Sequence, residues 1–104
     1  MTLRVAIAGA SGYAGGEVAR LLEGHPEFEL ATLTAHSAEG QLVESVHPQL
    51  STLHGRTFEK TTLDVLSGHD VVVIALPHGD SGAVGEELLA QGGQKLIVDL
   101  GADR

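Results

Sequence analysis

The pattern of apolar and polar positions divides the chain into five predicted strands with helices between them. Uninterrupted apolar runs are typical of strands that are buried on both faces of a parallel sheet. The predicted strands cover residues 3–8, 28–34, 57–61, 71–75 and 95–100. The third of these runs is the most polar, so we expect it near an edge of the sheet. This order of elements predicts an α/β fold, a doubly wound, mostly parallel, Rossmann-like sheet with the strand order 3-2-1-4-5.

The helices are predicted from apolar side chains that recur every three or four residues. The clearest helix covers residues 14–23, and Gly24 and Pro26 end it in the usual order. The other predicted helices are a short one beside a long loop within residues 38–56, one from a capping-box pattern at Thr61 and Asp64 to Leu66, and one that follows Ser81.

Three glycines, Gly9, Gly12 and Gly15, join the first strand to the first helix. We expect Gly9 to adopt dihedral angles that a Cβ would forbid, and Gly15 to leave room for the helix to pack on the strand. Gly12 would let the backbone approach a pyrophosphate, which the helix N-terminus attracts. The first gap is one residue longer than in the usual dinucleotide motif, and a plain turn is the alternative. The strand before the glycines and the helix after them favour a nucleotide site.

The end of the second strand indicates which nucleotide. An Asp or Glu at this place would bind the ribose 2′-hydroxyl of NAD, but this chain has Thr34, Ala35, His36 and Ser37. A carboxylate would repel a 2′-phosphate, whereas hydroxyl and imidazole groups can donate hydrogen bonds to it. We therefore predict NADP rather than NAD. The alternative is that these are ordinary polar loop residues, since no arginine accompanies them.

Residues 76–81 follow the most apolar strand, at the edge where doubly wound sheets bind their ligands. We expect this loop to face the cofactor. His78 could reach substrate or nicotinamide, although a structural hydrogen bond is the commoner role of a single loop histidine. Ser81 could equally cap the helix that follows it.

The six histidines do not predict a metal site. None of them is paired at a spacing of four residues, and no carboxylate completes a recognisable ligand set. We expect them on the surface or in loops. Glu86 and Glu87 are adjacent and point in different directions, so they do not predict a pair of acid–base carboxylates.

Composition excludes several classes of function. The formal net charge is −8 with only 6 Lys and Arg residues in 104, which argues against a DNA or RNA partner. Without cysteine, the chain has no disulfide, thiolate metal ligand or cysteine nucleophile. Apolar runs are too short to span a bilayer, and no signal-peptide pattern is present. We expect one cytoplasmic domain over residues 1–104 with no membrane partner.

Five segments together make the chain resemble the N-acetyl-γ-glutamyl-phosphate reductase family, relatives of aspartate-semialdehyde dehydrogenase. The segments are residues 9–15, Leu22 with His25 and Pro26, Leu33 and Thr34 with Ser37 and Gly40, residues 75–79 with Ser81, and residues 99–103. The resemblance covers essentially the whole chain. It implies reduction of N-acetyl-γ-glutamyl phosphate to N-acetylglutamate semialdehyde with NADPH, in arginine biosynthesis, through a thioester on a cysteine with a histidine as acid–base partner.

The family's cysteine comes after the point where this sequence stops, so the resemblance implies the N-terminal, cofactor-binding part of a homo-oligomeric enzyme. It implies no catalytic residue in this chain. The residues implied to hold the pyrophosphate are Gly9, Ser11, Gly12, Tyr13, Ala14 and Gly15. Those implied to hold the 2′-phosphate are Thr34, His36 and Ser37, and those implied to line the nicotinamide side are Leu76, Pro77, His78 and Ser81. The family has a residue between the counterparts of Asp103 and Arg104, so no role is assigned to Arg104.

Three alternative functions remain open at this point. One is a non-catalytic sensor that reports NADP to a partner, and another is the cofactor domain of a different semialdehyde dehydrogenase. The third is a flavodoxin-like domain with an empty crevice. A short-chain dehydrogenase would need Tyr-x-x-x-Lys, but Glu17 lies four residues after Tyr13, the single tyrosine. A cysteine later in the parent protein would favour the enzyme over the sensor.

Overall fold

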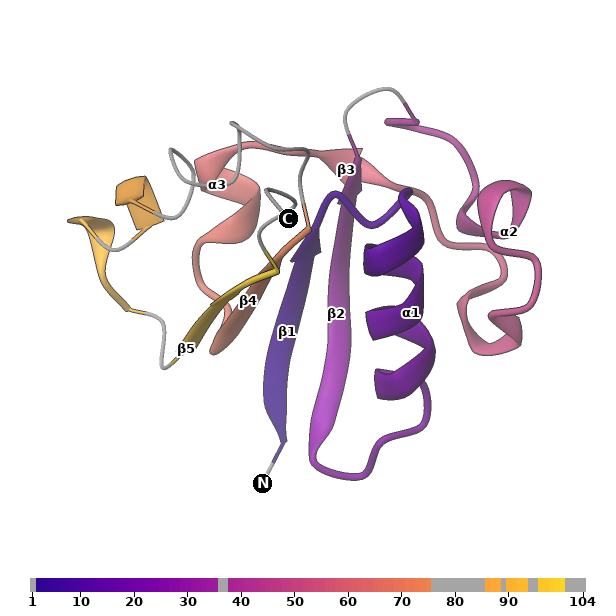
Figure 1. The fold of residues 1–104 in the computed structure, drawn as a ribbon, viewed down its shortest axis with the longest axis horizontal. Helices are drawn as coiled ribbons and strands as arrows, with labels where there is room; N and C mark the ends of the chain where they lie inside the picture. Colours follow the sequence, from indigo (N-terminus) through magenta and orange to yellow (C-terminus); the bar gives the residue numbers. More distant parts are fainter. Residues whose placement is uncertain (1, 36–37, 76–85, 89, 94–95, 101–104) are drawn as a thin grey trace.

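The structure, a computed structural model, describes the chain except for residues 1, 36–37, 76–85, 89, 94–95 and 101–104 (Figure 1). Its strands are β1 Leu3–Ala8, β2 Phe28–Ala35, β3 Glu59–Lys60, β4 Val71–Ile74 and β5 Leu96–Asp99. Its helices are α1 Tyr13–Leu22, α2 Val43–Val46, α3 Leu63–Leu66 and the 3₁₀ helix η1 Ser51–Leu53. Residues 86–88 and 90–91 are also helical.

The five strands form one sheet in the order β3-β2-β1-β4-β5, and each neighbouring pair is parallel. The predicted order is thus confirmed, and the polar third strand lies at the edge, shortened to two residues. Since all strands run the same way, their carboxyl ends meet at one edge of the sheet (Figure 1). The turn from β1 into α1 lies at this edge.

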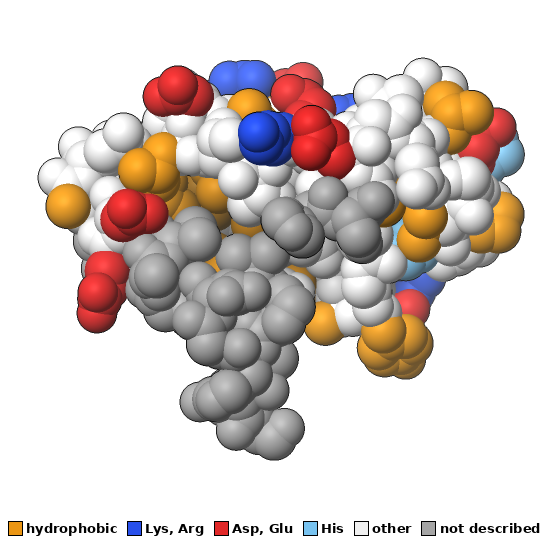
Figure 2. Space-filling view, turned by 90° about the horizontal axis from the view of Figure 1, so that it is seen from above, with side chains coloured by type: hydrophobic (Ala, Val, Ile, Leu, Met, Phe, Trp, Pro, Cys, Tyr) orange, Lys and Arg blue, Asp and Glu red, His pale blue; other side chains and the backbone are white. Residues whose placement is uncertain are grey.

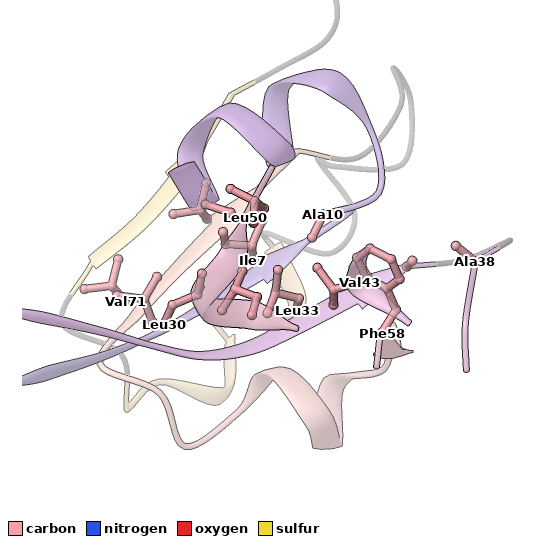
Figure 3. Close-up of a cluster of buried hydrophobic side chains, with 14 residues drawn as sticks. Ile7, Ala10, Leu30, Leu33, Ala38, Val43, Leu50, Phe58 and Val71 are labelled. Carbon is pink, nitrogen blue, oxygen red and sulfur yellow. The ribbon is translucent and has the colours of Figure 1, made fainter. Parts of the chain in front are cut away.

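Alternate residues of each central strand face opposite layers, as the pleat requires. Val5 and Ile7 of β1 belong to a cluster on the α1 side, which also includes Leu33, Leu50 and Phe58 (Figure 3). On the other face, Ala6 and Ala8 pack in a second cluster.

That second cluster includes Leu66 of α3, Leu88, and Val72 and Ile74 of β4. Leu66 and Leu88 are buried there almost completely. Both faces of the sheet are therefore covered, and the doubly wound arrangement is confirmed.

The helix ends agree with the sequence pattern except at α3. Gly24 follows α1 with a φ of +77°, the left-handed geometry expected of a glycine past a helix end. The cap of α3 is Thr62, whose hydroxyl accepts a hydrogen bond from the N–H of Val65 at 3.2 Å. The predicted cap at Thr61 is wrong by one residue, because the Thr61 hydroxyl instead donates to Thr34 in the sheet.

Residues 38–58, called here the α2 segment, form a short helix and a long loop, as expected. The segment is closed on itself by an antiparallel bridge between Leu42 and Thr57. It lies beside α1 (Figure 1) and is tied to it where Glu23 accepts hydrogen bonds from the backbone N–H and hydroxyl of Thr52, at 2.8 and 2.5 Å. The α2 segment is thus fixed against α1 by these hydrogen bonds.

None of the helices in the described part of the chain combines the length and apolar character needed to cross a membrane.

Candidate functional site

The glycine turn, residues 9–12, is fixed to the end of β2 by two hydrogen bonds. The backbone N–H groups of Gly9 and Ala10 both donate to the carbonyl oxygen of Thr34, at 3.1 and 2.8 Å. Gly9 has a φ of +82°, in the left-handed region that strongly favours glycine. The predicted role of Gly9 in the turn is confirmed.

Gly15 and Gly12 differ in what surrounds them. A Cβ placed on Gly15 would lie 2.6 Å from the carbonyl oxygen of Gly9 and 2.7 Å from the Cα of Ala10. Real Cβ atoms do not come this close, so the predicted tight packing of the helix on the turn is confirmed. Among the described residues, a Cβ on Gly12 would meet the Gly9 carbonyl oxygen, at 3.8 Å, which is an ordinary van der Waals contact. The described part of the fold therefore leaves room for a side chain at Gly12.

The first turn of α1 presents unpaired donors. The N-cap residue is Gly12, which has no side chain to bind the first N–H groups, and the carbonyl of Gly12 accepts from Gly16. The N–H groups of Tyr13, Ala14 and Gly15 therefore lack an intrahelical acceptor. Tyr13 and Ala14 are exposed, and the first turn carries no acidic residue.

Figure 2 looks onto this end of the molecule, and the acidic side chains visible there are spread over it rather than gathered in one patch. N–H groups without an intrahelical acceptor, together with the positive end of the helix dipole, attract anions.

Thr34 does not offer its side chain to a ligand. The residue is completely buried, and its hydroxyl donates to the Ile7 carbonyl at 3.5 Å and accepts from the Thr61 hydroxyl at 2.8 Å. Its carbonyl oxygen holds the glycine turn. The expected contact between the Thr34 hydroxyl and a 2′-phosphate is therefore not supported, because the hydroxyl is occupied inside the protein. His36 and Ser37, expected beside it, lie outside the described residues.

The predicted nicotinamide loop also lies outside the described residues, with Leu76, Pro77, His78 and Ser81. Ala75, the residue before this loop, is described. The N–H of Ala75 donates to the carbonyl oxygen of Ala8 at 2.8 Å, and Ala8 immediately precedes the glycine turn. The chain thus leaves β4 beside the start of the turn, as the predicted strand order requires.

Two of the four described histidines lie in loops, as the expectation of surface or loop positions allowed, but are buried. His47 and His69 are buried, with 8% and 5% of their surfaces exposed. His47 reaches the carbonyl oxygen of Ala10 in the glycine turn through Nε2, at 2.8 Å, and His69 reaches the Thr32 hydroxyl at the same distance. His25 and His54 are exposed, as expected. Within the described residues, no group of three His, Cys, Asp or Glu side chains could hold a metal ion.

The sequence contained one signal for the burial of His47. It lies four residues after Val43, which is fully buried, so both side chains share one face of a helical turn. A histidine on an apolar face is usually buried and hydrogen-bonded. The spacing of His47 from Val43 therefore predicts burial better than the general expectation of surface or loop histidines does.

Among the described residues, Glu23 is the titratable group whose pKa clearly departs from its ordinary value. Hydrogen bonds from the hydroxyl and then the backbone N–H of Thr52 hold the pKa of Glu23 below its ordinary value of 4.5, helped by the nearby His54 and opposed by partial burial. A pocket of about 450 Å³ lies beside it, lined by Leu22, Pro26 and Phe28 among others. These residues lie at the amino edge of the sheet, opposite the glycine turn, so the pocket is not part of the anion site.

A family model described as the semialdehyde dehydrogenase NAD-binding domain matches residues 4–104. The chain is 54% identical over 103 residues to N-acetyl-gamma-glutamyl-phosphate reductase of Streptomyces avermitilis, and 50% identical to the protein of that name from Micrococcus luteus. Each alignment covers 99% of this chain and 29% or 30% of the relative. The chain therefore spans about three tenths of the length of these curated relatives.

Two solved structures share the fold. Aspartate semialdehyde dehydrogenase with NADP from Candida albicans has a TM-score of 0.75 at 21% identity, over 97% of this chain and 30% of that one. GenD2 from gentamicin A biosynthesis, in complex with NAD, has a TM-score of 0.66 at 27% identity, over 93% of this chain and 26% of that one. With the family model matching nearly every residue, this chain belongs to the semialdehyde dehydrogenase NAD-binding domain family.

Proposed function

We propose that this chain binds NADP at the glycine turn and forms the cofactor-binding part of an N-acetyl-γ-glutamyl-phosphate reductase. The observation that carries the proposal is the start of α1, where backbone N–H groups have no acceptor within the helix and the first turn has no acidic residue. A pyrophosphate is the anion that fits such a turn when a strand precedes it and a helix follows. The named reaction comes from the relatives, which are 50–54% identical in this region.

In this proposal, each residue of the glycine turn has a separate task. Gly9 makes the turn and Gly15 lets α1 pack on it, while Gly12 leaves the backbone open to the pyrophosphate. Ser11, Tyr13 and Ala14 contribute backbone N–H groups. The open surroundings of Gly12 support this division, because none of the described residues lies close enough to require glycine at that position.

The adenosine 2′-phosphate is assigned to His36 and Ser37, which follow β2. Thr34 contributes indirectly, because its carbonyl oxygen holds the turn and its hydroxyl is bonded within the sheet. The nicotinamide side is assigned to four residues that follow β4: Leu76, Pro77, His78 and Ser81. Their support is the position of Ala75 beside Ala8, at the start of the glycine turn.

When bound, NADPH supplies the hydride that reduces an acyl group to the aldehyde level. This chain's residues bind the dinucleotide and orient it, and no catalytic residue is assigned to them. The chain has no cysteine, so a thioester-forming nucleophile must belong to another part of the protein. The substrate, N-acetyl-γ-glutamyl phosphate, the homo-oligomeric state and the cytoplasmic location are parts of the same proposal for the whole protein.

Calorimetric titration of the chain with NADP and with NAD tests the proposal, with Gly12→Val as the blocking variant. Gly12 has extended backbone angles, φ −81° and ψ 175°, which valine adopts readily, so the variant should keep its fold. Its melting temperature should fall slightly, because valine is a poorer N-cap than glycine. We expect NADP to bind more tightly than NAD, and Gly12→Val to weaken NADP at least about tenfold. Tighter binding of NAD would overturn the 2′-phosphate assignment. Unchanged NADP binding by folded Gly12→Val would overturn the site.

A further inference from the structure

His47 comes from the α2 segment, far along the chain from the glycine turn, yet it is part of the turn's support. Its imidazole is 8% exposed, and Nε2 lies 2.8 Å from the carbonyl oxygen of Ala10. A carbonyl oxygen can only accept a hydrogen bond, so Nε2 carries the proton and donates it. In the neutral ring this contact fixes the tautomer.

The start of α1 is shaped to admit this ring. A Cβ placed on Gly16 would lie 2.4 Å from Cε1 of His47 and 2.9 Å from each ring nitrogen. The imidazole thus rests directly on the backbone of α1, in space that any other residue at position 16 would fill. Phe58 meets the ring edge-on, with 6.4 Å between the ring centroids. Burial, glycine and aromatic contact together hold the ring in one position.

Ala10 is held at both ends of its backbone. Its N–H donates to the carbonyl of Thr34 at 2.8 Å, and its carbonyl accepts from His47. The Ala10 carbonyl and the Ser11 N–H belong to the same planar trans peptide, in which the two groups point in opposite directions. A donor that holds the carbonyl therefore aims the Ser11 N–H away from His47.

We propose that His47 is a positioning residue of the dinucleotide site, which orients the Ala10–Ser11 peptide so that the Ser11 N–H faces the bound pyrophosphate. The inference rests on the NADP site proposed above. His47 itself touches no cofactor atom in this account and acts through the peptide. Its hydrogen bond also polarises that peptide, which makes the Ser11 N–H a better donor.

The test compares two replacements of similar length. His47→Met removes the donor, while His47→Gln keeps an N–H group that can reach the Ala10 carbonyl. By calorimetry we expect His47→Met to raise the dissociation constant for NADP about threefold to tenfold, the range for one neutral hydrogen bond, and His47→Gln to recover most of the loss. In the free chain, the amide NMR signal of Ser11 should move in His47→Met and stay close to its wild-type position in His47→Gln.

His69→Met is the matched control, because His69 is equally buried and its Nε2 bonds the Thr32 hydroxyl in the sheet rather than the turn. It should lower the melting temperature and leave the NADP affinity unchanged. Wild-type affinity in folded His47→Met, or an equal loss in His69→Met, would overturn the inference. If the wild-type chain does not bind NADP, the proposed function fails, and the Ser11 signal still decides whether His47 orients the peptide.

Gly16→Ala should disrupt the hydrogen bond between His47 and the Ala10 carbonyl oxygen without replacing the histidine. Alanine favours the helix, so this variant should fold even if His47→Met does not, and its methyl group should push the ring away from Ala10. We expect a similar rise in the NADP dissociation constant. An unchanged affinity and an unmoved Ser11 signal in Gly16→Ala would contradict the positioning role.

Discussion

At the scale of single residues, the three glycines after β1 differ in backbone geometry and in the space around them. Gly9 needs a positive φ, Gly15 needs the absence of a side chain against backbone, and Gly12 has open space around it. The first two properties belong to the fold, and the third is the one that the proposed pyrophosphate contact would use. Substitutions at these positions should therefore separate stability from binding.

Gly15→Ala should destabilise the chain by about 1–3 kcal/mol, the usual cost of overpacking. Its methyl group would lie 2.6 Å from the Gly9 carbonyl oxygen, and neither backbone can move aside without shifting α1. Urea unfolding measures the loss. Gly12→Ala is the matched control and should stay within about 0.5 kcal/mol of wild type. Equal effects of the two substitutions would contradict the separation.

Thr34→Val should cost about 1 kcal/mol of stability, because it leaves the Thr61 hydroxyl without its partner. It should leave the ratio of NADP to NAD affinity unchanged, since the Thr34 hydroxyl faces the protein interior. Ser37→Ala, in contrast, should lower that ratio if Ser37 contacts the 2′-phosphate. Calorimetry with both nucleotides checks the pair. A lower ratio in Thr34→Val would show that the hydroxyl reaches the ligand after all.

Local pattern could predict the roles of Gly9 and Gly15, because turn geometry and helix packing depend on residues close in sequence. It could not predict the hydrogen-bond partners of Thr34 and His47. The Thr34 hydroxyl is bonded to a residue 27 positions later, and His47 to one 37 positions earlier. Sequence spacing does not show such partners, so the pattern predicts neither the inward-facing Thr34 hydroxyl nor the contact of His47 with the glycine turn.

At the scale of elements, α1 and β2 depend on the α2 segment for side-chain contacts that the sequence pattern did not reveal. The strand order followed from apolar runs and the right-handed crossover rule. The packing of residues 38–58 against α1 and β2 did not follow from this pattern, because it depends on charged and polar side chains in a stretch with little periodicity. Arg56 and Glu23 make two of these contacts.

Arg56→Met should destabilise the chain by about 1.5–3 kcal/mol. The guanidinium donates to the carbonyl oxygens of Leu30, at 2.7 Å, and Ala31, where β2 shifts register against β1 and has no strand on its other side. Arg20→Met is the control, since Arg20 makes an exposed ion pair with Glu17 that should be worth less than about 1 kcal/mol. Chemical unfolding compares them. An equal or smaller loss in Arg56→Met would contradict the strand-edge role.

Glu23→Gln should reduce stability at neutral pH and lose its effect in acid. The pKa of Glu23 is lower in the folded chain than its ordinary value of 4.5. The charged carboxylate therefore stabilises the fold fully at pH values above 4.5, and this contribution is lost as the pH falls through the pKa of the folded chain. Urea midpoints of wild type and variant should differ at pH 7 and converge near pH 3. A difference that persists or grows in acid would rule out the charged hydrogen bonds to Thr52 as the cause.

At the scale of the whole molecule, the proposed nucleotide site lies at the carboxyl edge of the sheet. There the glycine turn, the end of β2 and the end of β4 come together (Figure 1). The pocket of about 450 Å³ at the amino edge is the competing location, lined by apolar side chains and by Glu23 and Glu29. Its carboxylates do not suit a polyphosphate, and a hollow surface alone does not define a nucleotide site.

Amide NMR of the chain during titration with NADP locates the nucleotide at one edge of the sheet or the other. We expect the largest shifts at Ser11, Gly12, Tyr13 and Ala14, with little change at Leu22, Gly24 and Phe28 near the opposite edge. The largest shifts at the amino edge, or none at the glycine turn while calorimetry shows binding, would contradict the proposed site.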